Sequence, residues 1–169
     1  MHRSAKLMIV SLLLGLAAEP AAALQPTVVA PPAFGVGAQT PLMVAHGVGA
    51  QIYECRPDAS GRTAWTFREP VATLISDGKT VGRHYLGPTW ELTDGVVITG
   101  KVLASEPGAT PADIPLLKLN VIERRGEGTL EAATLVLRLN THGGDLKGGC
   151  ERAGELRAEP YSADYIFLR

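Results

Sequence analysis

The segment from residue 82 to residue 91 gathers the side chains of this chain that are best suited to chemistry. It contains an imidazole, a phenol, an indole and a carboxylate, at His84, Tyr85, Trp90 and Glu91, with a Gly-Pro pair between them. Side chains alternate faces along a strand, so His84 and Tyr85 point in opposite directions unless the chain bends there. A turn at the Gly-Pro pair would bring Trp90 and Glu91 back toward one of them. Such a group of side chains lines binding pockets, but it also occurs as a satisfied polar corner of a fold.

Aromatic rings next to polar side chains favour ligand binding. Trp and Tyr rings stack on sugars and other small polar molecules, while nearby amides and carboxylates form hydrogen bonds to them. Strands also favour aromatic residues, so each ring has a second interpretation as a residue of the hydrophobic core. We favour a noncatalytic role, either in binding a small polar ligand such as a carbohydrate or in association with the cell envelope. The candidate ligand-binding residues are His84, Tyr85, Trp90, Glu91, Asn140 and Tyr165.

A secreted hydrolase is the alternative function. The sequence has no G-x-S-x-G motif that would present a serine nucleophile. Glycosidases, however, need only two carboxylates, roughly 5–9 Å apart. Glu91 is the best candidate for the acid, because the environment of an indole can raise a carboxyl pKa as general-acid catalysis requires. Its partner would be Asp94, Asp145, Asp164 or His84. Catalysis is the less favoured function, so we assign no catalytic residues; in an enzyme they would be Glu91 and His84.

The histidines of the exported part do not have the spacing of a metal site. His46, His84 and His142 stand far apart in the sequence, whereas zinc and copper sites usually show motifs such as H-x-H or H-E-x-x-H. The similar glycine runs at 35–39 and 47–51 lack the third glycine and the following helix of a nucleotide-binding loop, and they indicate turns. We therefore predict no metal site and no cofactor.

The N-terminus has the pattern of a secretory signal peptide. Arg3 and Lys6 precede an apolar run at 7–18, and three alanines at 21–23 supply the small residues of a cleavage site. The run is shorter than the roughly 20 apolar residues that span a bilayer, so we expect no membrane span after cleavage. The sequence thus predicts export to the periplasm or the extracellular space. The predicted parts are a signal peptide at 1–23, a Pro/Gly-rich extended lead-in at 24–41 and one β-domain at 42–169.

The charge of the mature chain is nearly balanced. Removal of Arg3, Lys6 and Glu19 with the signal peptide leaves 14 basic and 16 acidic side chains. A nucleic-acid partner or an anionic membrane surface would require a basic excess. We therefore exclude nucleic acid as a partner and expect an unknown small polar ligand.

Two cysteines, Cys55 and Cys150, fall within the exported part. In an oxidising compartment an even pair most simply forms a disulfide. The alternatives are a reactive thiol or a metal-binding pair, although no nearby histidine or further cysteine supports either. The sequence favours the bridge and leaves these alternatives open.

Hydrophobic residues recur with a period of two along most of the chain, as they do in strands. Asp-Gly pairs at 77–78 and 94–95 separate such runs, and they are strong hairpin signals. The fold class is therefore all-β, an antiparallel sandwich or a partly closed barrel of about eight to nine strands in a single domain. The predicted strands are 42–46, 50–55, 63–68, 71–76, 80–86, 96–104, 116–123, 133–141 and 161–168.

Several short motifs, in order, resemble one family. They are 51–55 (QIYEC), the segment ending in Trp90-Glu91, 138–144 (RLNTHGG), Gly149-Cys150 and 160–165 (PYSADY). This pattern is similar to the secreted family catalogued as domain of unknown function 3455, over roughly residues 42–168. The family has no established activity, so the resemblance implies a fold but no reaction. It also implies that Cys55 and Cys150 match the family's cysteines, which strengthens the prediction of a disulfide.

Overall fold

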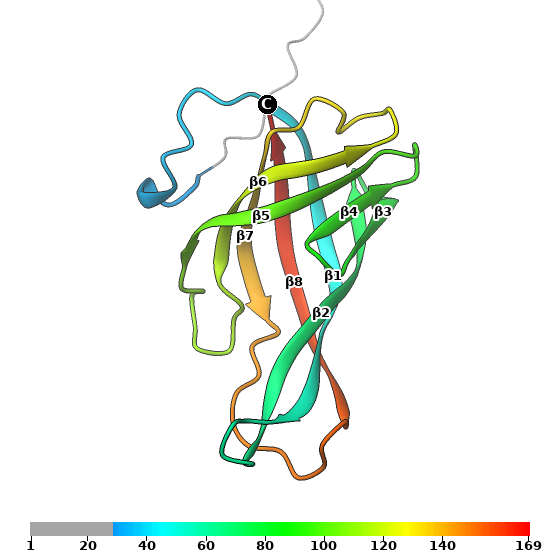
Figure 1. Ribbon diagram of the computed structural model, residues 1–169. Coiled ribbons are helices and arrows are strands. Elements are labelled where there is room, and N and C mark those ends of the chain that lie inside the picture. The colour runs from blue at the N-terminus through cyan, green and yellow to red at the C-terminus, as the bar shows by residue number, and fades with distance from the viewer. Residues whose placement is uncertain (1–28) are drawn as a thin grey trace, which may run out of the picture.

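The computed structural model describes residues 29–169 (Figure 1). The predicted signal peptide at 1–23 and the first part of the predicted lead-in lie outside the described residues. None of the helical structure in residues 29–169 is long and apolar enough to cross a membrane. The elements are a 3-10 turn, η1 (Pro32–Phe34), and the strands β1 (Pro41–Pro57), β2 (Thr63–Ser76), β3 (Lys79–Tyr85), β4 (Thr89–Leu92), β5 (Val97–Glu106), β6 (Leu116–Arg125), β7 (Leu135–Gly143) and β8 (Leu156–Leu168).

The strands form one antiparallel sheet that closes on itself. Each strand pairs with the next in chain order, and β8 returns to pair with β1, from Pro41 opposite Leu168 to Glu54 opposite Leu156. The all-β prediction of eight to nine antiparallel strands is confirmed, and the pairing of β1 with β8 makes the fold a closed barrel. Closure leaves no unpaired sheet edge within the ring, which removes a site of unwanted strand pairing.

The two longest strands, β1 and β2, continue through positions where the sequence predicted a break between two shorter strands. β1 joins the predicted strands 42–46 and 50–55, and β2 joins 63–68 and 71–76. The glycines at 47 and 49 are therefore strand residues and not a turn. A Cβ at Gly47 would lie 2.6 Å from Cε2 of Tyr165, and one at Gly49 would lie 2.0 Å from the Val71 carbonyl oxygen. Glycine is needed there because a ring and a neighbouring strand approach the backbone closely.

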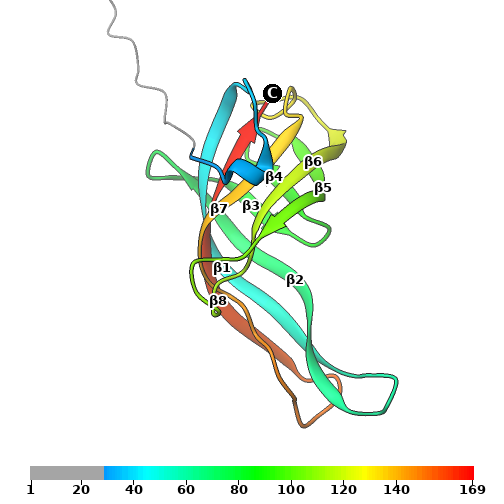
Figure 2. The same ribbon diagram turned by 90° about the vertical axis from the view of Figure 1, so that its left-hand side faces the viewer.

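Three strands extend beyond the ring and form an arm. β2 pairs with β3 only from Ala72 onward, and β7 pairs with β8 only as far as Gly143. We call the remaining three-stranded part, residues 51–57 of β1, 63–70 of β2 and 156–160 of β8, the arm. It projects from the end of the barrel opposite the C-terminus (Figure 2).

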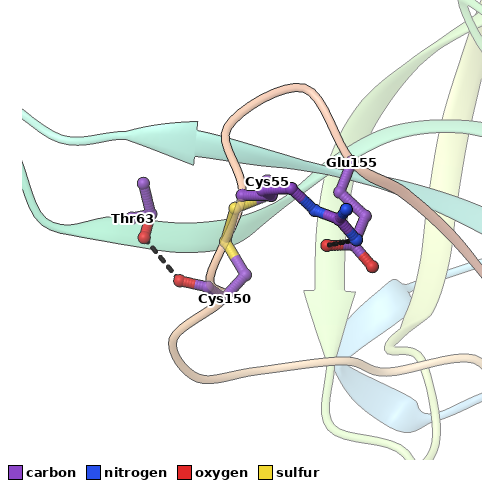
Figure 3. The surroundings of a disulfide bond; sticks show 5 residues. Cys55, Thr63, Cys150 and Glu155 are labelled. Atoms are coloured by element: carbon purple, nitrogen blue, oxygen red, sulfur yellow. Dashed lines mark hydrogen bonds and ion pairs between the residues drawn. A yellow bond between two sulfur atoms is a disulfide. The ribbon is translucent and has the colours of Figure 1, made fainter.

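A disulfide fastens the loop between β7 and β8 to the arm. Cys55 and Cys150 are bonded, as predicted, and close a loop with a sequence separation of 95 (Figure 3). Thr63 donates a hydrogen bond from its hydroxyl to the Cys150 carbonyl oxygen, and the Cys55 N–H donates to the Glu155 carbonyl oxygen at 2.8 Å. The loop therefore follows the arm through both covalent and backbone contacts.

Apolar side chains fill both faces of the sheet at β7 and β8. The residues before β1 cross the outside of these strands, where Phe34 is almost completely buried and the Lys118 ammonium donates to its carbonyl oxygen. The outer cluster consists of Phe34, Leu135, Leu137, Leu139, Ile166 and Leu168. The larger inner cluster includes Trp90, Ile98, Leu119, Val136, Tyr165 and Phe167. Because the leucines of β7 face outward, Val136 and Arg138 between them face the barrel interior.

Candidate functional site: the barrel cavity

The hairpin of β3 and β4 separates the four residues of the 82–91 motif into two pairs. His84 lies opposite Trp90 in the register, and Arg83 lies opposite Glu91. His84 and Trp90 point into the barrel and are buried, whereas Tyr85 and Glu91 lie on its outer face. Of these four candidate ligand-binding residues, the hairpin therefore places only His84 and Trp90 in the interior, because alternate side chains of a strand project from opposite faces.

The outer pair forms a compact ion-pair cluster. Arg83 donates from Nη2 to both carboxylate oxygens of Glu91, at 3.0 and 2.9 Å, and the Tyr85 hydroxyl donates to Glu91 at 2.9 Å. The hydrogen bond from Arg83, with that from Tyr85, holds the pKa of Glu91 below its ordinary value. A general acid requires a raised pKa. Glu91 also lies on the opposite face from His84, so the geometry does not bring the proposed hydrolytic residues together.

The carboxylates considered as partners for Glu91 have structural contacts of their own. Asp94 accepts hydrogen bonds from the backbone N–H groups of Val96 and Thr129 at its turn. Asp145 forms an ion pair with Lys147, and Asp164 forms one with His46 at 2.8 Å. Asn140 belongs to this last group, because its Nδ2 donates to Asp164 at 2.8 Å on the exposed face. Asn140 is thus placed away from His84 and Trp90.

A cavity of about 340 Å³ lies where the ring meets the arm. Its lining comes from the arm, the β3–β4 hairpin, β5, the start of β6, β7, β8 and the loop residues Ile114, Pro115 and Asp145. Phe67, Leu86 and Val102, which are about half exposed, form an apolar rim. The lining also includes Gln51, Arg68, His84, Trp90, Leu117, Arg138, Asp145 and Tyr165. Of the candidates, the cavity therefore brings together His84, Trp90 and Tyr165.

Stacked and edge-on rings form the closed end of the cavity. The His84 imidazole stacks on the Trp90 indole at a centroid distance of 4.7 Å and an interplanar angle of 12°. Tyr165 and Phe167 contact the same indole edge-on, at 5.6 and 5.9 Å. The Tyr165 hydroxyl lies 3.0 Å from that of Tyr161. These contacts fix the rings, so the closed end is preorganised.

His84 is neutral in this setting. Burial lowers its pKa from 6.5 to about 4, and the positive charge of Arg138 acts in the same direction. Its Nδ1–H donates to the Thr89 carbonyl oxygen at 2.8 Å, which leaves the other ring nitrogen as an acceptor at neutral pH. Burial also raises the pKa of both Tyr161 and Tyr165, so their hydroxyls remain protonated. The site thus holds no imidazolium or phenolate at neutral pH.

Two polar groups that line the cavity lack partners. Nε2 of Gln51 and Nε1 of Trp90 are buried without a hydrogen bond among the described residues. Sequence reasoning did not select Gln51 or Arg138 as site residues. A signal was present for Arg138, because it alternates with three leucines in β7 and shares a face with Val136. A charged side chain on one face of an apolar strand is uncommon and indicates a specific contact.

The described part of the chain gathers no group of three or more His, Cys, Asp or Glu side chains suited to holding a metal ion. A family model with the description "Protein of unknown function (DUF3455)" matches residues 36–169. The chain belongs to this family. The match to DUF3455 spans β1 to β8 and so includes both cysteines and every residue that lines the cavity. No curated protein and no solved structure matches the chain.

Proposed function

We propose that this protein is a noncatalytic binding protein that takes up one small ligand in the barrel cavity. The observation that carries the proposal is the cavity itself, with mostly apolar walls, a rigid aromatic end and a few polar groups. Small-molecule sites have this composition, and their volumes run from about 300 to about 1,000 Å³. The cavity is at the lower end of that range, so it suits a ligand of modest size.

We expect a ligand with an apolar body, and not a sugar that stacks on the face of an aromatic ring. Trp90 is only 1% exposed, and its faces and edges are occupied by His84, Tyr165 and Phe167. No indole face is left for a sugar ring to stack on. The rim of Phe67, Leu86 and Val102 instead favours an aliphatic or aromatic body. We therefore propose an amphipathic small molecule in preference to a carbohydrate.

The proposal includes action outside the cytoplasm, in the periplasm, at the envelope or in the extracellular space. The signal-like sequence at 1–23 supports it. The bridge between Cys55 and Cys150 also supports it, because structural disulfides persist in oxidising compartments.

A substitution that blocks the entrance of the cavity tests this function. Val102, on the rim, is 45% exposed, and its neighbour Leu103 is 60% exposed and does not line the cavity. We expect 1-octanol and octanoate to bind saturably to the wild type in isothermal titration calorimetry. Val102→Trp should weaken binding at least about tenfold, because the indole occupies the entrance. Leu103→Trp, which adds the same indole outside, should bind like the wild type. Equal binding by both variants, or no saturable binding by the wild type, would contradict the proposal.

A further inference from the structure

A guanidinium enters the barrel at the cavity. Arg138 lies on β7 opposite Leu117 of β6 and Tyr165 of β8, and both of these residues also line the cavity. Its Nε and Nη2 donate to the Pro115 carbonyl oxygen, at 3.0 and 2.8 Å. This backbone contact positions the planar group and leaves further N–H donors of the guanidinium free, since arginine has five.

Arg138 is partly buried and has no carboxylate partner among residues 29–169. The other charged side chains that line the cavity are paired: Arg68 with Glu69 at 3.2 Å, and Asp145 with Lys147 at 2.5 Å. None of the ion pairs formed within residues 29–169 includes Arg138. Charges in protein interiors are normally paired, because desolvation without a counterion is costly. The cavity therefore carries one unbalanced positive charge.

Two further residues of the lining, Gln51 and Trp90, carry hydrogen-bond donors that lack a partner among the described residues. Gln51 is 2% exposed, and both its free Nε2 and the free Nε1 of Trp90 are hydrogen-bond donors. Arg138, Gln51 and Trp90, from three different strands, all belong to the lining of one cavity. Buried donors without acceptors are rare in folded proteins, and each calls for a specific explanation. An acidic ligand accounts for the missing carboxylate partner of Arg138, and its oxygens are acceptors of the kind that the Gln51 and Trp90 N–H groups lack among the described residues.

We propose that the ligand is a monocarboxylate, with its carboxylate bound by Arg138 and its apolar body extending to the rim. This inference rests on the proposed function and adds the chemical class of the ligand. The fork of a guanidinium matches the two oxygens of a carboxylate, and Gln51 and Trp90 supply further donors to the oxygens of the ligand. A singly charged head group balances the single unpaired charge of Arg138. A phosphate dianion would need a second positive charge, which neutral His84 does not supply.

The test compares three probes that share an eight-carbon chain: octanoate, octanamide and 1-octanol. Calorimetry should show that the wild type binds octanoate about 10- to 100-fold more tightly than octanamide, the range expected for hydrogen bonds to a charged group. Arg138→Gln should abolish this preference, and Arg138→Lys should restore only part of it, because the charge returns without the fork. Arg125→Gln is the matched control. It removes the same charge from an exposed position outside the cavity and should leave the preference unchanged.

The outcomes separate this inference from the proposed function. If octanoate, octanamide and 1-octanol bind the wild type equally, the cavity binds ligands but the assignment to a carboxylate is wrong. If none of the three binds, both proposals are wrong. Should Arg138→Gln fail to fold by circular dichroism, Gln51→Met provides the second variant, since it removes a donor while keeping the length of the side chain. It should reduce the preference for octanoate about three- to tenfold, and an unchanged preference would overturn the role of Gln51 as a donor.

Discussion

His84 makes the stability of this protein sensitive to pH. Its imidazole is buried against Trp90 and Tyr165, and burial lowers its pKa to about 4 from 6.5. The unfolded chain therefore takes up a proton near pH 6.5, while the folded protein resists protonation until the pH is near 4. Stability is at its full value above pH 6.5 and is lost as the pH falls toward 4.

Urea unfolding at pH 7, 6 and 5 measures this effect. For the wild type we expect the free energy of unfolding to fall by about 2 kcal/mol between pH 7 and pH 5. His84→Gln should remove most of this fall, because the glutamine does not titrate. His142→Gln, at an exposed histidine, should behave like the wild type. A fall in His84→Gln as large as that of the wild type would assign the pH dependence to other groups.

For individual residues, the sequence predicts which side chains lie on opposite faces of a strand, but it does not predict which of the two faces is the barrel interior. The period of two correctly separates His84 from Tyr85. In β7, however, the leucine stripe at 135, 137 and 139 would normally identify the core face, and here it faces outward beneath Phe34. Arg138 consequently points into the cavity. The reversal depends on contact with residues far away in the sequence, which no local pattern contains.

Among the elements, strands are predictable where turn chemistry marks their ends. The Asp-Gly pair at 77–78 does lie between β2 and β3, and the Asp-Gly pair at 94–95 lies between β4 and β5. The four-residue strand β4 is too short to show a period by itself. β1 is continuous through Gly47 because the Tyr165 ring occupies the space of a side chain, and this packing is not visible in the sequence.

The disulfide stabilises the arm and, through it, one wall of the cavity. Replacement of Cys55 and Cys150 by serine should lower the free energy of unfolding by about 2–5 kcal/mol, as expected when a long loop is no longer closed. Chemical denaturation of the oxidised wild type and the double variant measures the difference. Adding a reductant should destabilise the wild type and leave the variant unchanged. If the reduced wild type is as stable as the oxidised protein, the bridge contributes little to the fold.

For the whole molecule, closure of the barrel is the property least accessible from sequence. It depends on pairing between β1 and β8, whose residues are more than a hundred positions apart in the chain. Alternating runs are equally compatible with a sandwich, so both architectures satisfied the pattern. The cavity is a further consequence of closure, since it lies where the eight-stranded ring gives way to the three-stranded arm.

The central claim is that a small ligand binds beside Trp90 inside the barrel, and the two tryptophans of the chain test it directly. Trp90 lies at the closed end of the cavity, and Trp65 lies on the arm opposite Cys55 and does not line the cavity. The two indole N–H signals of ¹⁵N-labelled protein, assigned with Trp65→Phe, can be followed during a titration with octanoate. We expect the Trp90 signal to shift progressively to saturation, because the ligand occupies the cavity that Trp90 lines, while the Trp65 signal stays in place. A Trp90 signal that does not move, or two signals that move together, would contradict binding in the cavity.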